Sequence, residues 1–391
     1  MNGKIQRLSA PTDTRFRVLV VDDSELQRTV LATLLDADPE LTVVGRAGDG
    51  PEAIRYAATL HPDVITIDLR MPGMDGIEAS RRIMQETPTP IVVVAAGISP
   101  EDRRLASEAL AAGALALVPK PSAGRNGERA AAELVATVKR MAQVRVIRRW
   151  TPERVATGQL RLPAAPARGT SGLLKQPRPG AAPATHLPEI VVIGASTGGP
   201  QALQAILPRL PASFAPPVVI VQHIAAGFAA SIVDWLAPQC ALPLQLAQAG
   251  QVLDHPGIYL APTGRHLLVQ GRTLALSDEP PLRGHRPSAT FLFNSVAASY
   301  GPHAIGVLLT GMGDDGAAGL VALRDAGATT IAQDEASSVV FGMPGVAIAL
   351  GAAGHILSPM QIPDLLIRLA SGNQERRPRT LLPSRGPLAG S

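Results

Sequence analysis

Residues 17–24 read RVLVVDDS, a short apolar run that ends abruptly in two acidic residues. Similar apolar runs follow at regular spacing, each separated from the next by a stretch with helical periodicity. Parallel strands need crossover connections, so this alternation predicts a parallel, doubly wound α/β domain. The predicted strands are 17–21, 42–46, 63–67, 91–95 and 114–118, and the predicted helices are 25–36, 51–59, 76–86, 101–112 and 128–142.

The same alternation resumes after Glu189. HLLVQ-GR-TLALS, residues 266–277, has the two-residue, glycine-containing turn of a β-hairpin. We therefore expect a second α/β domain, doubly wound and mainly parallel, with one antiparallel hairpin. Its predicted strands are 190–194, 218–222, 257–262, 266–270, 273–277, 304–311 and 328–333, and its predicted helices are 200–208, 228–236, 288–300, 316–326 and 359–371.

Residues 143–188 interrupt this rhythm. They contain seven prolines, eight lysines and arginines and one glutamate, without sustained apolar periodicity. Such a composition buries little core and predicts a Pro/Arg-rich linker. We therefore expect a first domain over 15–142, the linker over 143–188, a second domain over 189–371 and a disordered tail over 372–391.

The positive charge of the chain belongs to these connecting segments. The formal net charge of the whole chain is +4, while the linker alone carries +7 and the tail +3. The two predicted domains are therefore net negative, and neither shows a basic face with interleaved aromatic residues. We expect no nucleic-acid partner.

Composition and termini bound the class of protein. The chain is 46% hydrophobic, and no apolar run approaches the ~20 residues that span a bilayer. The N-terminus MNGKIQRLSAPTDTR lacks the apolar core of a secretory signal, and the single cysteine, Cys240, excludes an internal disulfide framework. We expect a cytoplasmic monomer that is not inserted in a membrane.

Three carboxylates and a lysine follow strands of the first predicted sheet. Asp22 and Asp23 follow RVLVV, Asp68 follows DVITI, and Lys120 follows ALALV. The carboxyl ends of parallel strands converge at one crevice, where clustered carboxylates favour a hard cation such as Mg²⁺. The pattern indicates phosphoryl transfer to an aspartate, with metal and lysine stabilising the charge.

VLVVDDS, DLRMPGMDG and the Lys120–Pro121 pair resemble a response-regulator receiver domain. The resemblance implies a flavodoxin-like, five-stranded parallel sheet of order 2-1-3-4-5. It also implies phosphorylation of Asp68 by a histidine kinase, a pocket of Asp22, Asp23 and Lys120, Mg²⁺ held by Asp23 and Asp68, and a cis bond before Pro121.

Two positions depart from the receiver pattern. Ala95 stands where the family offers a serine or threonine hydroxyl to the phosphoryl group, and Leu117 stands at the aromatic switch position. Arg70, two residues after Asp68, places a cation near the predicted phosphorylation site. We therefore do not expect the usual readout of phosphorylation in this chain, whereas phosphorylation of Asp68 remains compatible with Ala95 and Leu117.

A serine stands at the tip of a predicted strand-to-helix turn in the second domain. GASTG, residues 194–198, satisfies the G-x-S-x-G pattern that exposes a nucleophilic hydroxyl, here Ser196. A dinucleotide-binding turn is disfavoured, because Ser196 replaces the central glycine and the next strand ends in Gln222-His223. His223 is the candidate base, and either Asp314 or Asp315 could orient it.

IGASTGGP, VQH, RPSATFLF, LTGMGDDGAAG and FGMP together resemble the catalytic domain of the chemotaxis protein-glutamate methylesterase family, CheB. The resemblance implies a triad of Ser196, His223 and Asp315, with the N–H groups near Thr197 and Met312 as oxyanion-hole candidates. It implies demethylation of glutamyl methyl esters on methyl-accepting chemotaxis receptors, deamidation of receptor glutamines, no cofactor for the esterase reaction, and inhibition by the unphosphorylated receiver.

Two other classes of protein could combine a receiver domain with a second domain. A phosphorylation-dependent binding module would keep the hydrolase fold without chemistry, and a transcriptional regulator would need a helix-turn-helix that nothing after residue 189 resembles. A substrate-positioning role is an open expectation for several loop residues of the second domain, which are Arg265, His266, Arg283, His285 and Arg286.

Overall fold

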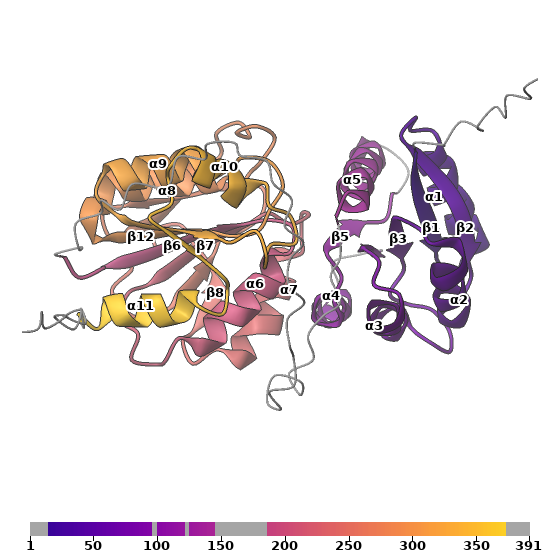
Figure 1. Ribbon diagram of the computed structural model, residues 1–391, viewed down its shortest axis with the longest axis horizontal. Helices are drawn as coiled ribbons and strands as arrows, with labels where there is room; N and C mark the ends of the chain where they lie inside the picture. The colour runs from indigo at the N-terminus through magenta and orange to yellow at the C-terminus, as the bar shows by residue number, and fades with distance from the viewer. Residues whose placement is uncertain (1–14, 96–99, 122–124, 145–185, 373–391) are drawn as a thin grey trace, which may run out of the picture.

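The computed structural model describes residues 15–95, 100–121, 125–144 and 186–372 (Figure 1). These residues form a five-stranded sheet, a seven-stranded sheet and a two-stranded hairpin. Nearly all of the predicted linker and tail lie outside the described residues, so the expectations about those segments stay predictions.

The first sheet is parallel throughout and has the order β2-β1-β3-β4-β5, which confirms the expected receiver topology. Its central strands are apolar on both faces because α1 and α5 cover one face and α2, α3 and α4 the other. The elements are β1 (Phe16–Val21), α1 (Glu25–Asp36), β2 (Leu41–Ala47), α2 (Gly50–Leu60), β3 (Val64–Ile67), α3 (Gly76–Glu86), β4 (Ile91–Ala95), α4 (Pro100–Ala112), β5 (Ala116–Pro119) and α5 (Arg125–Ala142).

Polar residues fix where the first helices begin. Ser24 and Asp75 occupy the N-cap positions of α1 and α3, and the Asp75 carboxylate accepts the Glu78 N–H at 2.8 Å. Gly76 follows directly, and a Cβ there would lie 2.0 Å from the Asp68 carbonyl oxygen. A glycine is therefore needed for α3 to start against the strand end that carries Asp68.

The second sheet is also parallel and has the order β14-β13-β12-β6-β7-β9-β8, with β10 and β11 as a separate antiparallel hairpin. The short strands β8 and β14 were not predicted, since three residues carry too little pattern. The strands are β6 (Ile190–Ala195), β7 (Val218–Gln222), β8 (Leu244–Leu246), β9 (Ile258–Leu260), β10 (His266–Gln270), β11 (Thr273–Ser277), β12 (Ala304–Leu308), β13 (Thr329–Gln333) and β14 (His355–Leu357).

Helices cover both faces of this sheet. Figure 1 shows α8, α9 and α10 on one side and α6, α7 and α11 on the other, each group packed on its own apolar cluster. Within the described ranges, no helix has both the length and the apolarity to cross a membrane. The helices are α6 (Gly199–Ile206), α7 (Ala229–Leu236), α8 (Ala289–Tyr300), α9 (Ala317–Asp325), α10 (Met343–Ala349) and α11 (Ile362–Ala370), with 3₁₀ turns η2 (Leu207–Arg209), η3 (Ala237–Gln239) and η4 (Gly301–His303).

The two sheets are joined by contacts between helices. The Ser107 hydroxyl on α4 donates to the Ser231 carbonyl on α7 at 2.7 Å. The Gln201 side chain on α6 donates to the carbonyl of Ala114, which precedes β5, at 2.9 Å. The receiver-like sheet therefore packs on the second domain through α4.

Candidate active site and acidic pocket

Ser196, His223 and Asp315 come from loops after three neighbouring strands, β6, β7 and β12. Backbone hydrogen bonds tie these loops together: the His223 N–H donates to the Ala195 carbonyl at 2.9 Å, and the Ser196 N–H to the Thr310 carbonyl at 3.0 Å. Neighbouring parallel strands deliver their carboxyl ends to one sheet edge. The expected convergence of the three residues at this edge is therefore observed.

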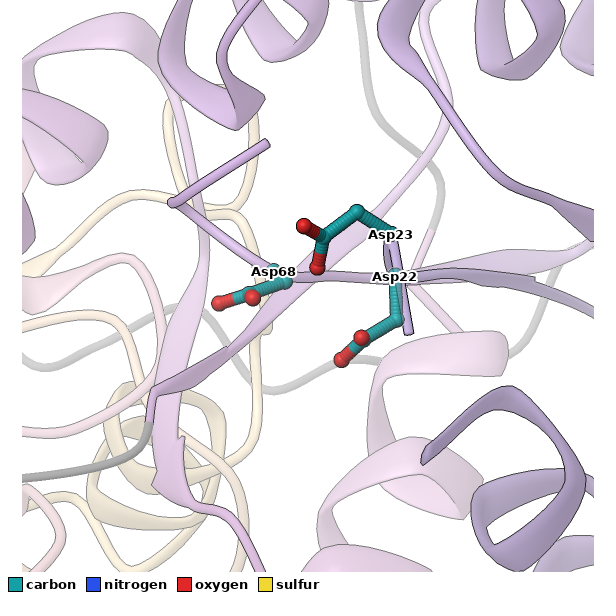
Figure 2. Close-up of side chains that lie close together, drawn as sticks. All are labelled: Asp22, Asp23 and Asp68. Atoms are coloured by element: carbon teal, nitrogen blue, oxygen red, sulfur yellow. The ribbon is translucent and has the colours of Figure 1, made fainter. Parts of the chain in front are cut away.

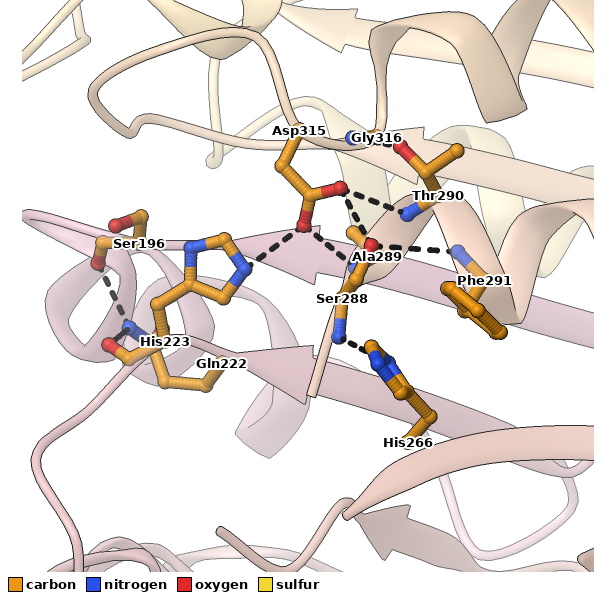
Figure 3. Close-up of polar contacts among 10 residues, drawn as sticks. All are labelled: Ser196, Gln222, His223, His266, Ser288, Ala289, Thr290, Phe291, Asp315 and Gly316. Carbon is orange, nitrogen blue, oxygen red and sulfur yellow. Dashed lines mark hydrogen bonds and ion pairs between the residues drawn. The ribbon is translucent and has the colours of Figure 1, made fainter. Parts of the chain in front are cut away.

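The His223 ring lies between Asp315 and Ser196. Its Nε2 is 2.9 Å from Asp315 Oδ2, while Nδ1 is buried and has no hydrogen-bond partner among the described residues. Figure 3 shows Ser196 on the opposite side of the ring from Asp315. Because an ionised carboxylate only accepts, Nε2 carries the proton and Nδ1 keeps its lone pair. A proton acceptor is thus available on the serine side.

The Asp315 carboxylate is anchored on the first turn of α8. Oδ1 accepts the Ser288 hydroxyl at 2.7 Å and the Thr290 N–H at 3.1 Å, and Oδ2 accepts the Ala289 N–H at 2.7 Å (Figure 3). Burial would raise the pKa of Asp315, but the hydrogen bonds from His223, Ser288 and Thr290 outweigh it and hold that pKa well below its usual range. Asp315 is therefore a fixed negative charge beside the imidazole.

The other acidic candidate, Asp314, does not reach His223. Its carboxylate forms an ion pair with the exposed Arg283. The residue pattern left the choice between the two aspartates open, and the structure places Asp315 on the histidine. Ser288 and Thr290, which hold Asp315, were not singled out from sequence, although the RPSATFLF motif contains both.

The loop that carries Ser196 depends on two glycines. Gly198 has φ +76°, which glycine adopts without steric cost, and a Cβ on Gly199 would lie 2.0 Å from Gln222 Oε1. The Gln222 side-chain amide donates to the carbonyls of Ser196 at 2.7 Å and His223 at 2.9 Å. A buried amide therefore holds the serine and histidine loops in fixed relation.

The oxyanion-hole candidates, the N–H groups of Thr197 and Met312, belong to two loops that approach each other at Ser196 and Gly311. Among the described residues, neither the Thr197 N–H nor the Met312 N–H donates a hydrogen bond to another group. The loop of Met312 comes close because Gly311 has no side chain: a Cβ there would lie 2.7 Å from Ser196 Cβ and 2.2 Å from Met343 Sδ. Unpaired donors near a serine are what an oxyanion hole requires.

The loop residues expected to position substrate have diverse contacts. Arg265 pairs with Asp278 at 2.9 Å, and Arg286 donates to the carbonyls of Asp278 and Glu279. His266 is fully buried and stacks on the ring of Phe291. These contacts hold loops in place. Arg283, in contrast, is exposed and pairs with Asp314, and the His285 ring stacks on the His223 ring.

In the first domain, Lys120 bridges two of the three predicted aspartates. Its Nζ lies 2.7 Å from Asp22 Oδ2 and 2.8 Å from Asp68 Oδ2. Burial raises the pKa of Asp68 and the Lys120 hydrogen bond opposes that shift. Burial would lower the pKa of Lys120, but its hydrogen bonds to Asp22 and Asp68 outweigh it and raise that pKa.

The donor set of this pocket fits a hard divalent cation. Asp22, Asp23 and Asp68 each offer a carboxylate oxygen within 4.8 Å of the others (Figure 2). Asp22 and Asp68 are buried and Asp23 is exposed, so the cluster opens to solvent on one side. Carboxylate oxygens are the ligands that Mg²⁺ prefers, and one lysine leaves their charge only partly compensated. The acidic cluster is thus suited to Mg²⁺.

The two residues that depart from the receiver pattern, Ala95 and Leu117, lie on the strands where they were expected. Ala95 ends β4 and Leu117 is buried on β5, so a methyl group and an aliphatic side chain replace the usual hydroxyl and aromatic ring. The expectation of a cis bond before Pro121 is wrong: among the described residues the cis peptide bond is Arg286–Pro287. With a trans bond after it, Lys120 still reaches both carboxylates.

Known proteins match both domains. Residues 191–366 match the CheB methylesterase family, and residues 18–131 match the response regulator receiver domain family. The chain is 45% identical over 359 residues to the Myxococcus xanthus protein named protein-glutamate methylesterase/protein-glutamine glutaminase 4, which covers 91% of this chain and 96% of that protein.

A second relative, protein-glutamate methylesterase/protein-glutamine glutaminase 1 of Syntrophus aciditrophicus, is 43% identical over 91% of this chain and 98% of its own length. The crystal structure of the Thermotoga maritima CheB methylesterase catalytic domain is also similar, with 37% identity over 46% of this chain and 98% of that chain and a TM-score of 0.45. The Myxococcus xanthus and Syntrophus aciditrophicus proteins each extend over both domains of the chain.

Proposed function

The chain belongs to the CheB family of protein-glutamate methylesterases, and we propose that Ser196, His223 and Asp315 hydrolyse glutamyl methyl esters on methyl-accepting chemotaxis receptors. The observation that carries this proposal is the His223 ring, with Nε2 on Asp315 and an unpartnered Nδ1 on the Ser196 side. A positioned base beside a serine is the requirement for nucleophilic ester cleavage.

In the proposed reaction His223 Nδ1 accepts the hydroxyl proton as Ser196 Oγ bonds to the ester carbonyl carbon. The N–H groups of Thr197 and Met312 bind the oxyanion that forms, and Asp315 stabilises the imidazolium. His223 then protonates the departing methoxide, which leaves as methanol. Water, deprotonated by His223, attacks the acyl-enzyme, and that proton returns to Ser196 Oγ as the glutamic acid side chain is released, which loses its remaining proton to solvent and becomes the carboxylate.

The same site can act on a glutamine side chain. An amide forms the same acyl-enzyme if His223 protonates the departing nitrogen, so that ammonia replaces methanol. The second half of the reaction is unchanged. We therefore include deamidation of receptor glutamines in the proposal, in keeping with the double name of both relatives.

Methanol release from a methylated chemoreceptor tests the proposal. Ser196→Ala should lose activity by at least about 10³-fold, because the nucleophile is removed. Ser371→Ala is the matched control, since Ser371 is the C-cap residue after α11 and, among the described residues, its hydroxyl bonds the Ile367 carbonyl alone. Undiminished release by Ser196→Ala would remove the proposed nucleophile.

For the first domain we propose phosphorylation of Asp68 by a CheA-type histidine kinase. Mg²⁺ would be held by Asp23 and Asp68, with Asp22 beside them, and would offset the negative charge of the phosphoryl group. Lys120, already bonded to Asp68, is placed to contact a phosphoryl oxygen. Because such a kinase uses ATP, we propose that the enzyme acts in the cytoplasm. We also propose that it acts as a monomer.

The contacts between the domains support restraint of the esterase by the receiver. Val339 and Val340, in the loop before α10, pack on the apolar cluster beside α5. The Val340 carbonyl accepts the Gly311 N–H at 3.0 Å, next to Met312. A shift of the receiver would therefore reach the loop beside Ser196 through Val339 and Val340. This connection does not involve the hydroxyl and the aromatic ring that Ala95 and Leu117 replace.

A further inference from the structure

A tight turn carries His285 into the active site. Leu282 and His285 exchange backbone hydrogen bonds of 3.1 and 2.9 Å, and the two residues between them, Arg283 and Gly284, have φ +50° and +86°. Two consecutive positive φ values are the signature of the tightest hairpin turns. Arg286, which follows, donates to the carbonyls of two residues across the loop, so the base of the turn is also anchored.

At the end of this turn His285 stacks face to face on His223. The ring centroids are 4.1 Å apart and the planes differ by 4°. The Asp315 bond fixes one atom of the His223 ring, but a single hydrogen bond leaves the ring free to tilt about it. A flat surface in parallel contact removes that freedom.

We propose that His285 is a positioning residue: its ring fixes the plane of His223 so that Nδ1 faces Ser196. This inference rests on the proposed function, since it assigns His223 as the base. His285 acts through the face of its ring, and no proton passes through it.

The charge state of His285 agrees with this role. Burial and the neighbouring His223 lower the pKa of His285 to about 4, Asp315 opposes that shift, and Arg140 on α5 adds to it. His285 is therefore neutral throughout the range in which His223 must accept a proton. A neutral ring face accommodates the imidazolium that forms on His223, whereas a second cation would repel it.

The rate at which a fluorophosphonate labels Ser196 in the full-length protein tests this role between pH 5 and 9. Three variants separate ring from charge: His285→Phe keeps a flat ring without a titrating group, His285→Leu keeps volume without a ring, and His285→Ala keeps neither. We expect Phe to label within about threefold of wild type, with an unchanged pH midpoint. Leu and Ala should label about tenfold more slowly.

Labelling of Leu or Ala at the wild-type rate would overturn the role, and so would a Phe variant as slow as Ala, which would show that polar atoms of His285 are needed. If Ala fails to fold, the comparison of Leu with Phe decides by itself. A wild-type protein whose Ser196 is labelled neither before nor after phosphorylation of Asp68 would instead contradict the proposed function, so the two failures are distinguishable.

Discussion

At the scale of single residues, the site depends on groups that hold the reacting ones. Ser288 is fully buried and does two things: its hydroxyl donates to Asp315 Oδ1 at 2.7 Å and accepts the Phe291 N–H at the start of α8. Through its own N–H it also bonds His266 Nδ1 at 3.3 Å. One serine thus links a buried histidine, a helix start and the proposed triad.

Ser288→Ala removes two of these bonds. We expect it to lower the free energy of unfolding by about 1–3 kcal/mol, because a helix cap is lost and Asp315 loses a donor. The esterase rate should fall as well, since Asp315 is held less firmly. Denaturant unfolding and methanol release measure the two effects. Ser358→Ala is the control, because Ser358 is a half-buried loop residue whose hydroxyl bonds the Gln361 side chain, away from Asp315, and equal values for both variants would contradict this role.

The lowered pKa of His285 should make the stability of the folded protein depend on pH. This pKa is lowered to about 4 in the folded protein, so above the unfolded value of 6.5 the titration of His285 has no effect on stability. As pH falls below about 6.5, the unfolded chain binds the proton first and the folded protein loses stability until pH about 4. His285→Phe should therefore lose less stability than wild type between these values in denaturant unfolding. Identical losses would show that His285 does not contribute.

At the scale of elements, the loops after β6 and β12 meet where glycine removes a side chain. A Cβ on Gly311 would clash with both Met343 and Ser196. We expect Gly311→Ala to lower the esterase rate at least about tenfold by displacing Ser196 or Met312. Gly250→Ala is the control, because an added methyl there meets nothing within 4 Å although the backbone has φ +80°. An unaffected Gly311→Ala enzyme would contradict the close approach.

Sequence reasoning predicted most elements because their patterns are long. The strand 218–222 and the helix 76–86 were predicted with the bounds that the structure has. The missed elements β8, β14 and α10 have three to seven residues each, too few for a period to emerge.

The site was only partly predictable from sequence. The residues at strand ends could be found because parallel strands share an edge. Asp315 could not be chosen over Asp314 from the residue pattern alone, and the contact of His285 with His223 could not be inferred, because it depends on how a loop 62 residues away folds back. The conformation of such loops is determined by tertiary packing, which leaves no periodic pattern in the sequence.

At the scale of the whole molecule, α4 of the receiver packs against α7 of the esterase domain. Ser107 lies buried in this contact, while Glu108 on the same helix is exposed. Ser107→Trp places a large ring where the helices meet and should separate the domains. We expect the unphosphorylated full-length protein to release methanol faster as a result, and Glu108→Trp to leave the rate unchanged.

An equal rate for Ser107→Trp and wild type would show that this contact does not restrain the esterase. The comparison needs no phosphoryl donor, so it tests the restraint apart from the chemistry at Asp68. The comparison also concerns Ala95 and Leu117. If loss of the α4–α7 contact alone releases the esterase, that release does not require the hydroxyl and the aromatic ring that these two residues replace.

In the proposed reaction, Ser196 forms a covalent acyl-enzyme during ester cleavage. The most direct measurement is mass spectrometry after rapid acid quench of the enzyme with a receptor peptide that carries a glutamyl methyl ester. We expect an adduct of the peptide, less methanol, on the fragment that contains Ser196, and no adduct in Ser196→Ala. Methanol release without an adduct at Ser196, or an adduct that persists on another residue in Ser196→Ala, would contradict it.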